Sequence, residues 1–153
     1  MNTQLRTISG ACLAAILTGY LVGCAAPPAP PPASVDCPQP KFTGKAPPDF
    51  YNRTNPLAAS AIDPKLGEKL YFDEVPGRYS CATCHGRSGN GRGPMSSQFV
   101  PPPRNLACIK VANIPDGQVF WTIRHGSPGT DMPAHTRFND EQTWQLVAYL
   151  KNF

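Results

Sequence analysis

The sequence has few charged residues and no continuous block of one sign. Charged side chains make up 16% of the 153 residues, against about 25% in an average soluble domain. The formal net charge is +4, and no block of Lys and Arg accompanies it, which argues against a nucleic-acid partner. Long hydrophobic runs are missing as well: the longest, within residues 7–23, is about 15 residues and short for a bilayer span. A multi-span membrane protein is therefore excluded.

Proline, in contrast, is abundant and unevenly distributed. Nine of the 19 prolines lie between Pro27 and Pro48, so this stretch cannot form a core and favours extended polyproline II. We interpret residues 24–48 as a semi-rigid tether; a proline-rich ligand for a partner is the alternative. Residues 49–153 remain for folding, enough for one small domain but not for a large enzyme or a repeat array.

The first 23 residues are typical of an export signal. A short polar start with one positive charge precedes the apolar run, which ends in Leu21-Val22-Gly23-Cys24. This ending resembles the bacterial lipoprotein box, which implies lipidation of Cys24 and a stable membrane anchor. An uncleaved anchor helix is the alternative. Both readings predict a protein of the cell envelope on the periplasmic side, and Ala25 slightly favours the outer membrane in a Gram-negative host.

The most informative motif is Cys81-Ala82-Thr83-Cys84-His85. On a helix, residues three apart share one face, so both thiols can reach the two vinyl groups along one haem edge. His85 then directs its imidazole at the iron, as in the attachment signature of c-type haem. A thioredoxin-like dithiol would need a strand–helix context, and a structural zinc site would need a second Cys or His pair. Neither is visible.

A haem iron in an electron carrier needs a second axial ligand, and Met132 is the best candidate. Pro133 pushes Met132 toward extended geometry on an irregular loop, 47 residues beyond His85. His135 is a competitor that would give bis-His ligation, and an open site is a further alternative. Met95 follows the motif too closely, and His125 is more typical of a helix C-terminus.

Helical patterns dominate the rest of the chain. Asp63 and Pro64 predict the start of a helix through Leu70-Tyr71. Asp116 is predicted to cap a second helix that stops at Gly126, and Asn139 with Gln142 predicts a capping box for the last one. No alternating strand pattern is present, so we predict an all-α domain of about three main helices, with much loop, around one covalently attached haem.

Together these motifs resemble class I monohaem cytochromes c from residue 60 to residue 153, and especially the lipid-anchored monohaem subunit of alternative complex III. The segments that carry the resemblance are 66–72, 81–86, 89–94, 116–123, 132–133 and 144–150. It implies that the first and last helices cross near Gly67 and Tyr149. It also implies that the Pro94 carbonyl, or else the wall formed by residues 101–103, supports His85, and that Arg104 and Trp121 approach a haem propionate.

Two cysteines remain after export, lipidation and haem attachment are assigned. Cys37 and Cys108 are left in an oxidising compartment, where a disulfide between them would pin the tether to the domain. The sequence does not show whether their Cα atoms come close enough to pair. If they stay free, either is available to join a partner chain.

The predicted function is one-electron transfer rather than enzymatic catalysis, because no catalytic acid, base or nucleophile stands out. His/Met ligation raises the reduction potential relative to bis-His ligation, which suits a respiratory-type chain, either as a shuttle or as a subunit of a larger oxidoreductase. Residues 78–137 hold seven Lys or Arg against two Asp, so a redox protein partner with an acidic docking face is expected. No small-molecule substrate is expected. The alternatives are a haem sensor or small peroxidase with an open distal site, and a thiol or metal redox protein without haem.

Overall fold

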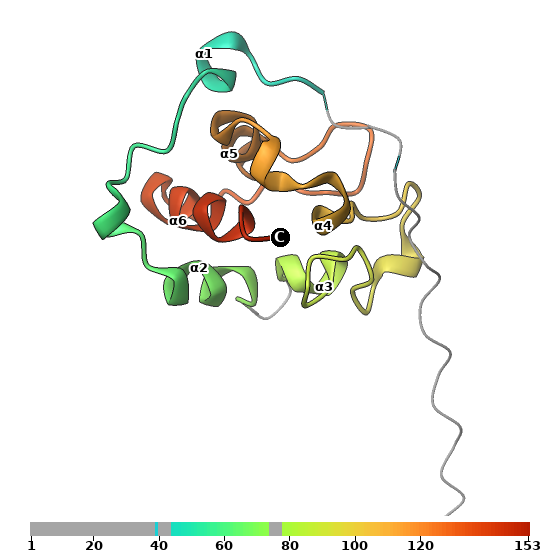
Figure 1. Ribbon diagram of the computed structural model, residues 1–153. Coiled ribbons are helices and arrows are strands. Elements are labelled where there is room, and N and C mark those ends of the chain that lie inside the picture. Colours follow the sequence, from blue (N-terminus) through green and yellow to red (C-terminus); the bar gives the residue numbers. More distant parts are fainter. Residues whose placement is uncertain (1–38, 40–43, 74–77) are drawn as a thin grey trace, which may run out of the picture. The chain divides into compact units, whose positions relative to one another are not determined.

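The computed structural model describes residue 39, residues 44–73 and residues 78–153. All regular structure in these residues is helical, which confirms the predicted all-α class. The α-helices are α1 (Pro48–Tyr51), α2 (Pro64–Tyr71), α3 (Cys81–His85), α4 (Leu106–Ile109), α5 (Asp116–His125) and α6 (Asp140–Leu150) (Figure 1). Single 3-10 turns are η1 (Ala59–Ala61), η2 (Ser96–Gln98) and η3 (Val111–Asn113). The three longest helices, α2, α5 and α6, are the three predicted ones.

Local capping explains where two of these helices begin. The Asp63 carboxylate accepts hydrogen bonds from the backbone N–H groups of Lys65 and Leu66, which satisfies otherwise unpaired donors at the start of α2. Asn139 and Gln142 form a reciprocal capping box at the start of α6. Both predictions are confirmed.

The start of α5 differs from the prediction. Pro115 is the N-cap and Asp116 is the first helical residue, without a capping hydrogen bond from its side chain. The Asp116 carboxylate instead accepts from the backbone N–H of Asn55 and pairs with Lys151 at 2.8 Å. These longer-range partners take the carboxylate away from its own helix. The predicted stop at Gly126 is confirmed, since this residue is the C-cap with φ at 76°.

The first and last long helices pack closely where they cross (Figure 1). A Cβ atom on Gly67 would lie 2.6 Å from the Cβ of Tyr149 and 3.0 Å from the carbonyl oxygen of Gln145. Such distances leave no room for a side chain, so the expected crossing at Gly67 and Tyr149 is confirmed.

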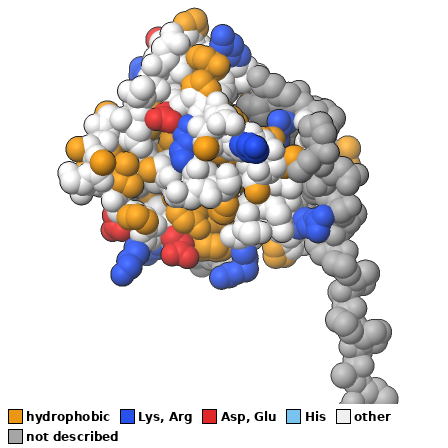
Figure 2. Space-filling model, in the orientation of Figure 1, with side chains coloured by type: hydrophobic (Ala, Val, Ile, Leu, Met, Phe, Trp, Pro, Cys, Tyr) orange, Lys and Arg blue, Asp and Glu red, His pale blue; other side chains and the backbone are white. Residues whose placement is uncertain are grey.

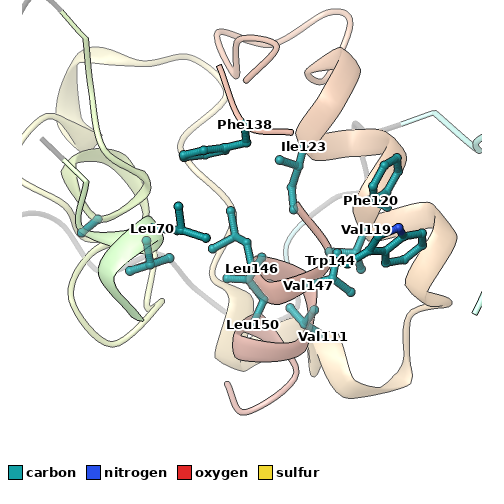
Figure 3. Close-up of a cluster of buried hydrophobic side chains, with 12 residues drawn as sticks. Leu70, Val111, Val119, Phe120, Ile123, Phe138, Trp144, Leu146, Val147 and Leu150 are labelled. Carbon is teal, nitrogen blue, oxygen red and sulfur yellow. The ribbon is translucent and has the colours of Figure 1, made fainter. Parts of the chain in front are cut away.

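One hydrophobic cluster joins α2, α5 and α6 (Figure 3). Trp144 stacks on Phe120 with ring centroids 4.3 Å apart. Leu146 and Val147 are almost fully buried, and Figure 3 shows Phe138 between Leu70 and Ile123. This packing fixes the frame on which the loops around α3 are held.

The packed region begins before the predicted boundary at residue 49. The side-chain amide of Gln118 on α5 accepts from the Ala46 N–H at 2.8 Å and donates to the Gly44 carbonyl at 3.2 Å. Residues 44–46 are therefore part of the folded domain and not of a free tether. The predicted signal segment 1–23 and Cys24 lie outside the described residues. Within the described ranges, no helix has the length and apolar character needed to cross a membrane.

Candidate haem site

The Cys-x-x-Cys-His motif forms α3, a short helix pinned at both ends. At its start, Ser80 accepts from the Thr83 N–H, and the two hydroxyl oxygens are 2.8 Å apart. At its end, the backbone N–H groups of Gly91, Gly93 and Met95 donate to the carbonyls of His85, Cys84 and Thr83. These bonds satisfy carbonyls that a helix end leaves without partners. The loop after the motif therefore holds both cysteines and the histidine in place.

Gly93 allows this loop to approach α3. A Cβ atom there would lie 2.2 Å from the Thr83 carbonyl oxygen, so only glycine fits. The next residue, Pro94, is solvent-exposed and directly follows the residue whose N–H donates to Cys84.

The carbonyl that supports His85 belongs to Arg104. His85 Nδ1 lies 2.8 Å from the Arg104 carbonyl oxygen, which corrects the predicted role of Pro94. The reason is that segment 91–95 pairs with the carbonyl end of α3, whereas the chain after residues 101–103 reaches the imidazole. A carbonyl only accepts hydrogen bonds, so Nδ1 carries the proton and Nε2 keeps its lone pair. Burial lowers the pKa of His85, and the Arg104 hydrogen bond offsets part of that shift.

Two adjoining cavities lie against the motif. Their volumes are about 310 Å³ and about 410 Å³, within the usual range for small-molecule and cofactor sites. Residues 101–103 line the first, and α5 and α6 contribute apolar side chains to the second. Five of the lining residues are shared by both cavities: Cys81, His85, Arg104, Met132 and His135.

Met132 reaches both cavities from an irregular loop, as its Met-Pro context predicts. The Met132 carbonyl accepts from the Ser127 N–H at 3.1 Å, and the Met132 N–H donates to the Thr130 hydroxyl at 3.2 Å. Gly126 lies against this loop, because a Cβ atom on it would be 2.6 Å from the Met132 carbonyl oxygen. The loop position of Met132 is thus fixed by its own turn and by the end of α5.

His135 lines the same cavities but has a different hydrogen-bond partner. Its Nδ1 lies 3.1 Å from an Arg137 guanidinium nitrogen. Because guanidinium only donates, Nδ1 is an acceptor and Nε2 carries the proton. Burial, the positive charge of Arg137 and that of His85, in this order, lower the pKa of His135 to about 4. Arg137 also pairs with Asp73, with 3.4 Å between Nε and the carboxylate.

The cysteines fall into two groups. Cys81 and Cys84 are free thiols. Burial raises the pKa of Cys81 to about 11 against a smaller opposing effect of Arg137, and burial also raises the pKa of Cys84. Reactive dithiols depend on lowered values, so the thiolate form is disfavoured here. Cys108 is disulfide-bonded, while its predicted partner Cys37 lies outside the described residues.

The remaining candidates from the sequence do not line either cavity. Met95 participates through its backbone at the end of α3. Trp121 stacks on His125 with ring centroids 5.1 Å apart, so its predicted approach to a propionate is not supported by the structure. His125 is exposed at the end of α5, with Nδ1 at 3.0 Å from the Trp121 carbonyl.

Three features of the site were not predicted from the sequence. They are the support of His85 by the Arg104 carbonyl, the series of contacts from Asp73 through Arg137 to His135, and the hydrogen bonds of Gln39 to Pro103 and Asn105. The group of Arg104 that bonds His85 is its backbone carbonyl, and no residue type marks such a carbonyl in a sequence. Arg137 and His135 are two apart on a loop, a spacing without a recognised meaning.

Comparison with protein-family models gives a match over most of the folded region. The family model described as Cytochrome c matches residues 64–153, more than half of the sequence. The chain therefore belongs to the cytochrome c family, which indicates electron transfer by a covalently bound c-type haem.

Among solved structures, the chain resembles the Kuenenia stuttgartiensis reducing HAO-like protein complex Kustc0457/Kustc0458, with a TM-score of 0.50 and 24% identity. The match covers 63% of this chain and 46% of that one, so this chain spans less than half of that neighbour. The likeness concerns the fold alone. No curated protein matches the chain.

The residues present fit such a cofactor. Two free thiols lie on one face of α3 at the edge of the cavities. The imidazole of His85 has its Nδ1 occupied, which leaves Nε2 for a metal. The cavity walls are mostly apolar, as a macrocycle requires.

Proposed function

We propose that this protein is a one-electron carrier with a single haem held by thioethers to Cys81 and Cys84 and by axial ligands His85 and Met132. The proposal places it in a respiratory-type electron transport chain, as a tethered shuttle or as a subunit of a larger oxidoreductase. When bound, the haem supplies reversible one-electron oxidation and reduction of its iron. The number of haems rests on the sequence, which contains one Cys-x-x-Cys-His motif.

The observation that carries the ligand assignment is that His85 and Met132 line the same two cavities. Met95, the other methionine after the motif, lines neither. His135 lines both, but Arg137 occupies its Nδ1 and the proton therefore resides on Nε2. A histidine in this state lacks a free lone pair for iron, whereas the thioether of Met132 needs no proton change.

The partner is proposed to be a redox protein that docks at the mouth of the first cavity. Tyr79 lines that cavity and is 54% exposed, and Val100, beside Pro101 of the same wall, is 91% exposed. Exposed aromatic and apolar groups are typical of interface cores. An acidic docking face on the partner would complement nearby basic groups.

The basic groups available for docking are fewer than the sequence count suggests. Arg124 bonds the Phe138 carbonyl and pairs with Asp140, and Arg137 pairs with Asp73. The exposed ones in residues 78–137 are Arg78, Arg87, Arg92 and Lys110. Figure 2 shows basic side chains scattered over one face with hydrophobic groups between them, rather than gathered in one patch.

Membrane attachment through a lipid on Cys24, in the cell envelope on the periplasmic side, is part of the proposal. Its support is the sequence of residues 1–24 and the proline-rich stretch that follows. An outer-membrane location in a Gram-negative host is the favoured version, because Ala25 follows the cysteine.

The deciding experiment is visible spectroscopy of the holoprotein, oxidised, reduced and then exposed to carbon monoxide. We expect a c-type reduced spectrum, the weak far-red band of sulfur bound to ferric iron, and no response to carbon monoxide. Met132→Ala is expected to abolish the far-red band and to create a carbon monoxide response. The matched control is Met95→Ala, which is expected to retain the wild-type spectrum.

Three other results of this spectroscopic experiment would change the assignment. A wild-type c-type spectrum that shifts with carbon monoxide would indicate an open distal site, and the sensor or peroxidase alternative would replace the carrier. Loss of the far-red band in Met95→Ala instead would reassign the axial ligand. A wild-type protein without covalent pigment would overturn haem attachment itself.

A further inference from the structure

Gln39 contacts the chain on both sides of Arg104, the residue whose carbonyl supports His85. Its Oε1 accepts from the backbone N–H of Asn105 at 2.6 Å, and its Nε2 donates to the Pro103 carbonyl at 3.3 Å. The residue between them is Arg104, whose carbonyl accepts from His85. Gln39 lies 25 residues before the start of the cytochrome c match at residue 64, outside the matched region.

The hydrogen bond from Asn105 to Gln39 and the one from His85 to Arg104 act on one peptide group. The Arg104 carbonyl and the Asn105 N–H belong to the same amide, which is planar. Fixing the direction of the N–H therefore also fixes the direction of the carbonyl. A hydrogen bond at the N–H end polarises the amide, so its carbonyl becomes a better acceptor for His85 Nδ1–H.

Two other glutamines make the same clamp elsewhere, and they show what is special about Gln39. Gln118 brackets Lys45 through Gly44 and Ala46. Gln145 brackets Ile62 by donating to the Ala61 carbonyl at 2.7 Å and accepting from the Asp63 N–H at 2.8 Å. A glutamine clamp is thus a recurrent structural device in this chain. Only the clamp of Gln39 holds a peptide that is bonded to His85.

We propose that Gln39 is a positioning residue for the proximal histidine. Through the Arg104–Asn105 peptide it orients and polarises the carbonyl that holds His85, and thereby lowers the reduction potential of the site. The direction follows from charge: a stronger acceptor at Nδ1 makes the imidazole more basic, which favours the ferric over the ferrous state. This inference rests on the proposed function, because it requires His85 to be the iron ligand.

The test compares holoproteins of the wild type, Gln39→Met and Gln145→Met. Methionine has a similar length but forms neither hydrogen bond of the clamp. Potentiometric titration of Gln39→Met is expected to show a higher reduction potential. At a fixed applied potential, the ferric-to-ferrous ratio is expected to fall roughly three- to tenfold, which corresponds to a shift of about 30 to 60 mV for one electron. In the reduced state, the His85 Nδ1 proton is expected to exchange with solvent several-fold faster by NMR.

Gln145→Met is the control for a purely structural effect. It removes an equivalent clamp that does not line the cavities, so it is expected to lower the unfolding stability without moving either the potential or the exchange of the His85 proton. Gln39→Ala gives the same comparison if Gln39→Met does not accumulate. An unchanged reduction potential and unchanged proton exchange in the Gln39 variants would overturn the inference. They would show that the Arg104–Asn105 peptide is already fixed by the Asn105 cap of α4 and by the hydrogen bond from the Leu106 N–H to the Gly89 carbonyl.

Failure of this inference is distinguishable from failure of the proposed function. A wild-type protein without a c-type spectrum would refute haem attachment before any variant is compared. A wild-type c-type spectrum together with unaltered Gln39 variants would refute the clamp alone.

Discussion

Tyr71 is the buried residue that connects the helical core to the haem-attachment motif. Its hydroxyl donates to the carbonyl of Gly86, directly after His85, at 2.6 Å. Its ring is fully buried and packs against Phe72, Tyr149 and Phe153. Burial is the main cause that raises the pKa of Tyr71, so the hydroxyl stays protonated and remains a donor.

We expect Tyr71→Phe to lower the free energy of unfolding by about 1 kcal/mol, because the Gly86 carbonyl loses its hydrogen bond from Tyr71 and keeps the one from the Gly89 N–H at 3.2 Å. Urea unfolding of the holoprotein measures the change. Tyr149→Phe is the matched control, since its hydroxyl has no hydrogen-bond partner among the described residues, and it is expected to unfold like the wild type. Equal stability of Tyr71→Phe and the wild type would show that packing alone holds this tyrosine.

At this scale, side chains with a chemical signature were predictable and their supports were not. Cys81, Cys84 and His85 form a motif, and Met132 precedes a proline, so the sequence singles out each of them. The support of His85 is a backbone carbonyl, and every residue except its neighbours could supply one. Gly93 lets segment 91–95 pack against the carbonyl end of α3. The imidazole of His85 is therefore bonded by a different carbonyl, that of Arg104.

Between elements, the closest packing is the crossing of α2 and α6. Gly67 faces the Tyr149 Cβ and the Gln145 carbonyl at distances that no side chain tolerates. Overpacking of this kind costs about 1–3 kcal/mol. The intrinsic helix preference of alanine over glycine acts in the opposite direction and amounts to about 1 kcal/mol, so the two effects compete at this position.

We expect the clash to prevail, because the nearest atoms are a Cβ and a backbone oxygen, and neither can rotate away. Gly67→Ala should therefore unfold at a lower urea concentration than the wild type. Gly44→Ala is the control: a Cβ atom there meets nothing within 4 Å, and its stability is expected to be unchanged or slightly higher. A Gly67→Ala protein more stable than the wild type would mean that the helices separate at little cost.

The helices themselves were predictable to the extent that their ends are local. Asp63 with Pro64 and Asn139 with Gln142 satisfy backbone groups within the next three residues, so sequence alone places these starts. Asp116 looks equally suitable as a cap, but the Asn55 N–H and the Lys151 ammonium compete for its carboxylate. Both competitors are more than 30 residues away in the sequence, and no local pattern reveals them.

At the scale of the whole molecule, Asp116 joins three parts of the chain. It binds the segment after α1 through Asn55, begins α5, and pairs with Lys151 just after α6. Lys151 also donates to the carbonyl of Ile114, so the end of the chain is tied to the turn that precedes α5. The packed N-terminal residues 44–46 meet the same helix through Gln118.

This junction makes the stability of the fold depend on pH. Burial by itself raises the pKa of Asp116, but the hydrogen bonds from Lys151 and Asn55 and the positive charge of Lys151 outweigh it, so the pKa lies below its usual value. A carboxyl group with a lowered pKa in the folded state stabilises the fold above its unfolded pKa of about 3.9. That contribution is lost as the pH falls through the lower, folded-state value.

We therefore expect Asp116→Asn to be less stable than the wild type by about 1 kcal/mol at pH 7, with a difference that shrinks steadily below about pH 4. Urea unfolding of both holoproteins across this range measures the difference, and the subtraction cancels effects of other groups that titrate in both. Asp140→Asn is the control, because Asp140 is 74% exposed and its pairing distance to Arg124 is 3.7 Å, so its loss should change stability by a fraction of that amount. A pH-independent difference for Asp116→Asn would assign its effect to geometry at the start of α5 and not to the charge that links the two ends of the domain.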